Sequence, residues 1–213
     1  ASNVIYQDLS KNAAAIEPPI WAAMLANHVR KNNRSPEILD CEAEGLNYEL
    51  SAKKILEYKS KIICFVIYGQ QPSASAQNMI GATEVAKLLK DLDSSVRILF
   101  VGGYVAALPR KTLEDEKAVD FVCTNEGVYT IDSLLELSNF EEQNLKKVKG
   151  LGFRDLDGNI IVNEASPIVS KANLENDLPG MAWDLLPGFE KYRTAGWHSW
   201  SNNSETAPFA ALY

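Results

Sequence analysis

Apolar runs and amphipathic stretches alternate along this chain. The apolar runs predict five strands, at residues 3–9, 36–41, 61–69, 96–103 and 118–127. Apolar residues at helical spacing predict helices that begin near Pro18 and Pro19, at 47–60, at 78–93, at Thr112 and at 130–140. The run at 61–69 is the most hydrophobic, so we expect this strand at the centre, covered on both faces. This order predicts an α/β fold with a doubly wound, five-stranded parallel sheet and right-handed crossovers.

The pattern changes after residue 145. Two strand-like runs flank Asp157-Gly158, which predicts a C-terminal β-hairpin. The stretch 175–209 is rich in Pro, Gly and aromatic residues without a sustained period, so we expect an ordered, irregular linker that wraps a neighbour. We therefore predict a domain at 1–145 and a hairpin plus linker at 146–213. The chain begins without Met and stops in an apolar run, so we expect a fragment of a longer protein.

Composition narrows the class of protein. The net charge of −7 comes without a basic stripe, which argues against a nucleic-acid partner. The apolar run Ile62 to Tyr68 is too short to span a bilayer, and no N-terminal signal pattern is present. Three cysteines without CxxC spacing predict reduced thiols in a cytoplasmic protein, each a small buried hydrophobe beside a strand: Cys41, Cys64 and Cys123.

Ligands of open α/β sheets bind beyond the carboxyl ends of the strands, so the loops at these ends are the candidate site. The loops expected there span 10–19, 40–45, 68–78, 102–110 and 124–127. The loop 68–78 is polar and nearly uncharged, which suits a large polar ligand that carries amides, although a solvated loop has the same composition. The pair Gly102-Gly103 lets a backbone approach closely, and a plain turn explains it equally well.

Several catalytic patterns are missing from the sequence. It contains no Walker loop, no Gly-x-Gly-x-x-Gly and no nucleophile elbow. Of the two histidines, we expect His28 on a helix surface, and His198 either packed in the linker or beside a reaction centre. We therefore predict no catalytic residue and no metal ligand in this chain.

Four stretches resemble the N-terminal domain of cobalamin-dependent radical S-adenosylmethionine enzymes. They are "EPPIWAAMLANHVRKNN…PEILDCEAEG", "VGGYVAALPRKTLEDEKAVDFVCTNEG", "VKGLGFRDLDGNIIVN" and "LPGMAWDLLP". The hexapeptide 40–45 also resembles the Asp-x-His-x-x-Gly motif of the cobalamin-binding fold in methionine synthase and the mutases. Asp40 and Gly45 are in register, but Glu42 stands in place of the histidine. The resemblance implies a Rossmann-like cobalamin-binding fold.

The resemblance also implies the role of the longer protein. In this family, a strand such as 208–213 leads into the three-cysteine motif of a [4Fe–4S] cluster. The expected partners are cobalamin and a radical SAM domain of the same parent chain, with S-adenosylmethionine and the cluster bound only in that full-length parent. The implied activity is methyl transfer from S-adenosylmethionine through cobalamin to a substrate radical, and this domain alone is expected not to be catalytic.

The resemblance places the corrin ring, its amides and its nucleotide tail against the loops after the strands. The implied cofactor-binding residues are Glu17, Pro18, Asp40, Glu42, Gly45, Tyr68, Gly69, Gln70, Gln71, Ser73, Ser75, Gln77, Asn78, Gly102, Gly103, Tyr104, Val105, Asn125, Glu126 and Gly127. Many relatives have Gly-Gly-Pro-His where this chain has Gly-Gly-Tyr-Val, so the role of that histidine does not carry over.

Glu42 carries a specific prediction. A glutamate is a harder donor than imidazole and would bring a charge beneath an apolar ring, which costs free energy. We therefore expect cobalamin to bind base-off, without a protein histidine on cobalt. Two alternatives stay open, a stand-alone corrinoid carrier or sensor module and a flavodoxin-like flavin-binding domain.

Overall fold

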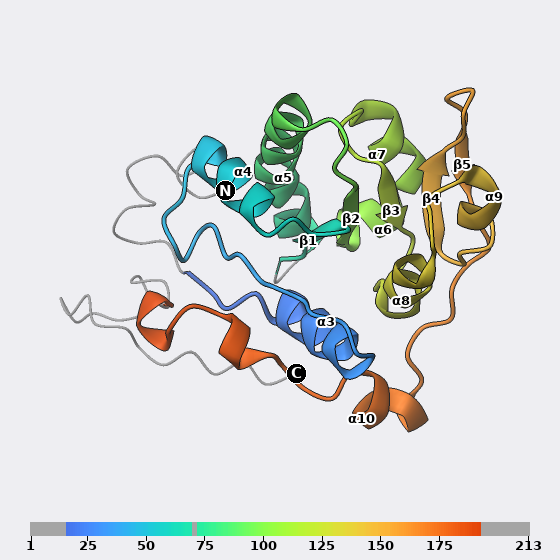
Figure 1. Cartoon of the computed structure of the whole chain (residues 1–213). Helices are drawn as coiled ribbons and strands as arrows, with labels where there is room; N and C mark the ends of the chain where they lie inside the picture. Colours follow the sequence, from blue (N-terminus) through green and yellow to red (C-terminus); the bar gives the residue numbers. More distant parts are fainter. Residues whose placement is uncertain (1–15, 70–71, 193–213) are drawn as a thin grey trace.

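The structure is a computed structural model that describes residues 16–69 and 72–192. Figure 1 shows a sheet with helices packed around it. The helices are α3 Ile20–Lys31, α4 Tyr48–Glu57, α5 Pro72–Leu92, α6 Gly103–Ala107, α7 Pro109–Asp115, α8 Val128–Glu136, α9 Glu142–Leu145 and α10 Leu174–Asp177. The strands are β1 Ile63–Ile67, β2 Ile98–Gly102, β3 Phe121–Cys123, β4 Leu151–Arg154 and β5 Ile160–Val162. The segment 163–192 after β5, called the connector below, contains short 3-10 turns at Lys171–Asn173, Trp183–Leu185 and Phe189–Lys191.

The five strands form one sheet in the order β1-β2-β3-β4-β5. The pairs β1·β2 and β2·β3 are parallel, so these three strands end at one edge of the sheet. β4 runs antiparallel to β3 and to β5, and Gly158 has φ 85° in the turn that joins β4 to β5. The second domain expected from the sequence therefore begins with strands that extend the same sheet.

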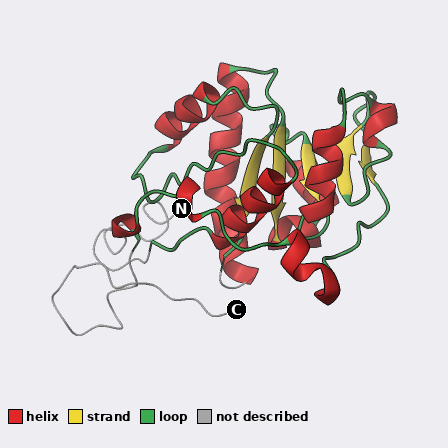
Figure 2. Ribbon diagram, turned by 60° about the horizontal axis from the view of Figure 1, so that its bottom comes forward, coloured by secondary structure: helices red, strands yellow, loops and turns green. Residues whose placement is uncertain are grey.

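Two apolar cores cover the two faces of the sheet, as the layers in Figure 2 also show. Leu99 and Val101 of β2 face a core with α3 and α8. Ile98 and Phe100 face the other core, which contains residues of α4, α5, α6 and α7. All four side chains are fully buried, because successive residues of a strand point to opposite faces. The predicted α/β class and its Rossmann-like layering are confirmed.

Three strand predictions need comment. The predicted strand 36–41 is wrong, because Pro36 offers no N–H to a ladder and the Asp40 side chain caps a turn over 41–45 by accepting from the Ala43 N–H. The predicted strand 3–9 lies outside the described residues. β1, expected at the centre, pairs only with β2 among the described residues and is therefore an edge strand there. Every residue of β2 and of β3 is buried.

The two long loops predicted after β1 and β2 are largely helical. α5 begins at Pro72, where proline suits the first helical position, so Ser73, Ser75, Gln77 and Asn78 are helix residues instead of loop residues. After β2, α6 begins directly at Gly103 and α7 begins at Pro109. The polar residues expected on a loop after β1 therefore belong to α5.

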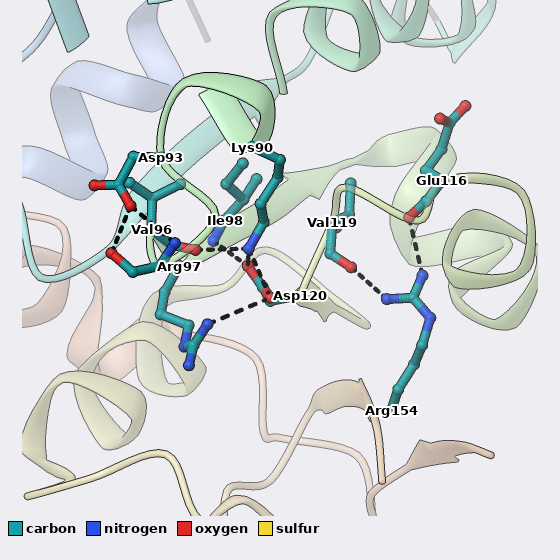
Figure 3. Close-up of polar contacts among 10 residues, drawn as sticks. Lys90, Asp93, Val96, Arg97, Ile98, Glu116, Val119, Asp120 and Arg154 are labelled. Atoms are coloured by element: carbon teal, nitrogen blue, oxygen red, sulfur yellow. Dashed lines mark hydrogen bonds and ion pairs between the residues drawn. The ribbon is translucent and has the colours of Figure 1, made fainter. Parts of the chain in front are cut away.

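The amino ends of the strands carry a network of paired charges (Figure 3). Asp120, just before β3, accepts from Lys90 at 2.8 and 3.0 Å and from the backbone N–H of Ile98 at 2.8 Å. Arg154 of β4 donates to the carbonyl oxygens of Val119 and Glu116 at 2.7 and 2.9 Å. These contacts tie α5, β2, β3 and β4 together at the edge opposite the candidate site.

In the part of the chain that the structure covers, no helix combines the length and the apolar character needed to cross a bilayer.

Candidate functional site

Ser75 joins the carboxyl ends of β1 and β2. Its hydroxyl donates to the carbonyl oxygen of Ile67 at 2.5 Å and accepts from the backbone N–H of Tyr104 at 3.1 Å. Only 2% of Ser75 is exposed. The hydroxyl of Ser75, predicted to touch the cofactor, therefore holds the start of α6 against the end of β1.

Gly102 and Gly103 follow β2 but have different surroundings. A Cβ on Gly102 would overlap the carbonyl group of Ile67, so the close approach of β1 and β2 requires glycine there. Gly103 is exposed, and a Cβ there would lie 3.8 Å from the Ser75 hydroxyl oxygen. Gly102 therefore allows β1 and β2 to pack closely, whereas the backbone of Gly103 is exposed at the end of β2.

The end of β1 is fastened on both sides. Asn78 of α5 donates from its side-chain amide to the carbonyl oxygen of Tyr68 at 3.0 Å. The Tyr68 ring stacks on Trp21 of α3, with centroids 4.7 Å apart. Burial, followed by the nearby Cys123 and Glu126, raises the pKa of Tyr68 to about 12, so its phenol stays protonated at neutral pH. Trp21 is a residue of this edge that was predicted only as part of a helix face.

The turn 40–45 gathers acidic side chains near the start of α3. Gly45 has φ 66°, and a Cβ there would have no other atom within 4 Å. Burial raises the pKa of Asp40, whose carboxylate accepts from Tyr192 at 3.1 Å. Burial and the charge of Glu42 raise the pKa of Glu17. Asp40 and Glu17 are partly buried, whereas Glu42 is exposed.

A groove of about 1250 Å³ runs from this turn along the edge of β1 that has no partner strand among residues 16–69 and 72–192. Four predicted site residues line it, Asp40, Glu42, Gly45 and Asn78. Its walls are otherwise largely apolar, with hydroxyl groups from Tyr48, Ser51, Tyr58 and Ser60 and the side-chain amide of Asn47. Charged residues also line it: Arg34, Glu37, Glu49, Lys59 and Lys61. The volume exceeds the roughly 300–1,000 Å³ of typical small-molecule pockets, so the groove suits a large ligand.

The turn after β3 is used within the protein. Asn125 donates to the carbonyl oxygen of Ser166 at 3.0 Å and accepts from the backbone N–H of Gly127 at 3.0 Å. Glu126 accepts from the backbone N–H of Val169 at 2.6 Å. Gly127, at φ 87°, begins α8. These side chains hold the connector 166–169 against the strand ends, and their contact with a cofactor stays a prediction.

The remaining predicted residues are scattered. Val105 is fully buried in the core beneath α6, and Pro18 is buried at the start of α3. Gly69 and Gln77 are exposed near the end of β1, whereas Gln70 and Gln71 lie outside the described residues. Tyr192 was missed, because it lies in an irregular connector where no periodicity marks a buried residue.

The histidine and cysteine predictions also have mixed outcomes. His28 is 4% exposed, so its placement on a helix surface was wrong; it packs between α8 and α10. His198 lies outside the described residues. Cys123 is buried as expected and Cys41 is partly buried. Cys64 borders the groove, and burial raises the pKa of its thiol to about 12. Among residues 16–69 and 72–192, no three His, Cys, Asp or Glu side chains are grouped to hold a metal ion.

The fold and this site define an α/β domain with its candidate ligand site at the carboxyl ends of parallel strands. The family described as B12 binding domain matches residues 6–135, and the chain belongs to this family.

A curated relative and solved structures give further comparisons. The chain is 28% identical over 180 residues to the uncharacterized methyltransferase PH0819 of Pyrococcus horikoshii, which covers 84% of this chain and 36% of that protein. The structure is similar to the cobalamin-dependent S-adenosylmethionine radical enzyme OxsB with aqua-cobalamin and S-adenosylmethionine bound, with a TM-score of 0.60 and 18% identity over 84% of this chain and 23% of OxsB. The apo form of OxsB matches with a TM-score of 0.53 over 78% of this chain and 21% of OxsB. The chain thus spans about a third or less of these proteins.

Proposed function

We propose that this chain is the cobalamin-binding domain of a cobalamin-dependent radical SAM enzyme, with methyl transfer as the activity of the whole protein. The family membership supports the cofactor. The likeness to OxsB supports the radical SAM context, and the methyltransferase relative supports the reaction. The expected S-adenosylmethionine, [4Fe–4S] cluster and cytoplasmic location belong to this proposal for the parent protein.

The observation that carries the proposal is the groove between the turn 40–45 and the end of β1. It is large and mostly apolar, it carries hydroxyl, amide and charged side chains, and it includes predicted residues from two separate segments. Asp40, Gly45 and Asn78 would hold the cofactor there, and the exposed backbone of Gly103 would flank its nucleotide tail. When bound, cobalamin supplies a cobalt centre that can carry a methyl group.

We propose further that cobalamin binds base-off, without a protein histidine on cobalt. Glu42 occupies the motif position at which the family has histidine. Within the described part of the chain, the one imidazole is that of His28, and both of its nitrogens are engaged by other groups. Electron paramagnetic resonance of the Co(II) form tests this, and we expect no nitrogen superhyperfine splitting. Splitting from a protein or benzimidazole nitrogen would overturn the ligand assignment while leaving cofactor binding intact.

Cofactor identity is tested by mixing the purified chain with hydroxocobalamin and, separately, with flavin mononucleotide, followed by desalting. We expect the corrin absorption to stay with the protein and the flavin to be removed. Retained flavin without corrin would favour the flavodoxin-like alternative. A Cys-x-x-x-Cys-x-x-Cys motif soon after Tyr213 in the parent gene separates the radical SAM proposal from a stand-alone carrier or sensor module.

A further inference from the structure

The connector 174–192 is fastened along α3. The backbone N–H of Ala182 donates to the carbonyl oxygen of Ala23 at 3.1 Å, and Asn27 donates to the carbonyl oxygen of Gly180 at 3.2 Å. Arg30 donates two hydrogen bonds of 3.0 Å to the carboxylate of Asp184. Figure 1 shows this part of the chain lying beside α3, with α10 at the far end of that helix.

His28 lies at the centre of this attachment. Its Nδ1 is 2.5 Å from the carbonyl oxygen of Asp177 on α10, and its Nε2 is 2.6 Å from Oδ2 of Asp132 on α8. The side chain is almost fully buried, so water cannot substitute for either partner. One residue therefore joins three helices that are far apart in the sequence.

Both partners of His28 are acceptors. A backbone carbonyl has no proton to give, so Nδ1 must carry one. A neutral ring would then point the Nε2 lone pair at the Asp132 carboxylate, and two acceptors at 2.6 Å repel each other. The imidazolium satisfies both contacts, because it donates from both nitrogens. The Asn32 amide nitrogen lies 3.4 Å from His28 Nε2 but only 2.7 Å from Asp132 Oδ2, to which it donates, so the carboxylate is the closer partner of both side chains.

The charged groups around His28 agree with this state. On α8, Asp132 faces the ring directly, and Tyr129 donates to the carboxylate of Asp177 at 2.5 Å. On α10, the charge of Asp177 acts on His28. On α3, Lys31 donates to the carbonyl oxygen of Asn176 at 2.5 Å, and its charge acts on Asp177. The Asp132 hydrogen bond raises the pKa of His28 above its usual value, burial opposes the shift, and the charges of Asp132 and Asp177 add to it.

We propose that His28 is a doubly protonated lock that holds α10 of the connector against α3 and α8, and that loss of one proton releases this segment. The lock fixes the direction in which the connector crosses the domain. It lies on the α3 and α8 side of the sheet and uses none of the residues assigned to cofactor binding.

The sign of the pH dependence follows from the direction of the shift. Because docking raises the pKa of His28, its stabilising contribution is complete below the undocked pKa, which is near 6.5 for an unperturbed histidine. The contribution is lost as pH rises through the raised pKa of the docked state. Within that window, we expect the protection of the α10 amides to fall by about tenfold per pH unit.

Nuclear magnetic resonance of the whole chain tests the protonation state. The variant His198→Gln leaves His28 as the only imidazole, and its ¹⁵N signals then report the protons on both nitrogens. The pH titration of these signals is compared with that of the same variant unfolded in urea. We expect both nitrogens of the folded chain to stay protonated to a higher pH than in the unfolded chain. A folded midpoint at or below the unfolded one would overturn the lock. This measurement needs no change at His28 or its partners, so it stands even if substitutions there prevent folding.

Hydrogen exchange of the amides at 174–182, corrected for the intrinsic rate, tests the coupling. Asp132→Asn keeps an acceptor oxygen but removes the charge, so the pH midpoint of release should fall by about one unit or more. The matched control is Arg30→Gln, which breaks the exposed pair with Asp184 and should lower protection equally at every pH. The proposal would be overturned if protection of the amides at 174–182 did not change over the pH range in which His28 titrates. An equal shift of the pH midpoint in both variants would also overturn it.

Discussion

The amino ends and the carboxyl ends of the parallel strands are held in place by different kinds of contact. At the amino ends of the parallel strands, Asp120 pairs with Lys90 and accepts from the backbone N–H of Ile98. Nearby, Arg154 donates to the backbone carbonyl oxygen of Val119. At the carboxyl ends of β1 and β2, a glycine and neutral hydrogen bonds make the junction, as at Gly102 and Ser75. The charges of the first edge are consumed in holding strands together, whereas the second edge leaves exposed backbone at Gly103.

This difference separates stability from binding. Sites in open α/β sheets lie at the carboxyl edge, where the backbone must come close to a ligand. A substitution at the amino edge should therefore change the free energy of unfolding alone. At the carboxyl edge, some substitutions should act on folding and others on the ligand, depending on which way the residue faces.

The largest effect is expected for Gly102→Ala. The new Cβ would overlap the Ile67 carbonyl group, which belongs to the backbone and cannot rotate away. We expect a loss of about 3 kcal/mol or more in the free energy of unfolding, at or above the upper range for overpacked cores. Urea denaturation measures it. A variant as stable as the unsubstituted chain would contradict the close approach of β1 and β2.

Asp120→Ala should have the next largest effect, at the opposite edge. It removes the partner of Lys90 and leaves the Ile98 N–H without its acceptor. We expect a loss of about 2 kcal/mol, because the pair is only partly exposed, with 19% and 23% of the two side chains accessible. Lys87→Ala is the control, since its pair with Glu84 is exposed and should contribute less than about 0.5 kcal/mol. Equal losses for both variants would sink the structural role of Asp120.

Ser75→Ala should cost less. It removes the bonds to the Ile67 carbonyl and the Tyr104 N–H, which lie in a buried junction. We expect a loss of about 1–2 kcal/mol, again from urea denaturation. Ser75→Thr keeps the hydroxyl and should lose less than Ser75→Ala. If the two variants are equally destabilised, the hydroxyl does not hold this junction.

Gly103→Ala should leave stability nearly unchanged. Gly103 is the exposed first residue of α6, and a new Cβ meets no atom closer than 3.8 Å. We expect a change within about 0.5 kcal/mol in the free energy of unfolding, as for other surface substitutions. A loss comparable to that of Gly102→Ala would remove the contrast between the two glycines.

Much of the fold followed from periodicity, and its exceptions have physical causes. The helices α3 and α4 and the buried strand β2 were predictable, because long apolar patterns dominate their local choice. The segment 36–41 was not, since its apolar residues face the groove while Pro36 and Asp40 favour an irregular path. Polarity alone could not distinguish a loop from the helix that begins at Pro72.

The sequence named the residues of the candidate site, but it did not reveal which of them already have partners within the protein. Gly102 and Gly103 are identical in sequence terms, and only the packing of β1 separates them. Asn125 and Glu126 looked available for a ligand, but the connector 166–169 consumes their hydrogen bonds. His28 looked like a surface residue because both of its partners come from more than 100 positions away. Such long-range pairing leaves no local pattern.

The most direct test of the account compares the affinity for hydroxocobalamin of the unsubstituted 213-residue chain with that of Gly103→Ala and of Asp120→Ala. Equilibrium dialysis measures it under conditions where all three proteins are folded. We predict at least about a tenfold loss for Gly103→Ala, equivalent to about 1.4 kcal/mol, and an unchanged affinity for Asp120→Ala. An unchanged affinity for Gly103→Ala, or a loss confined to Asp120→Ala, would contradict cobalamin binding at the carboxyl edge of the sheet.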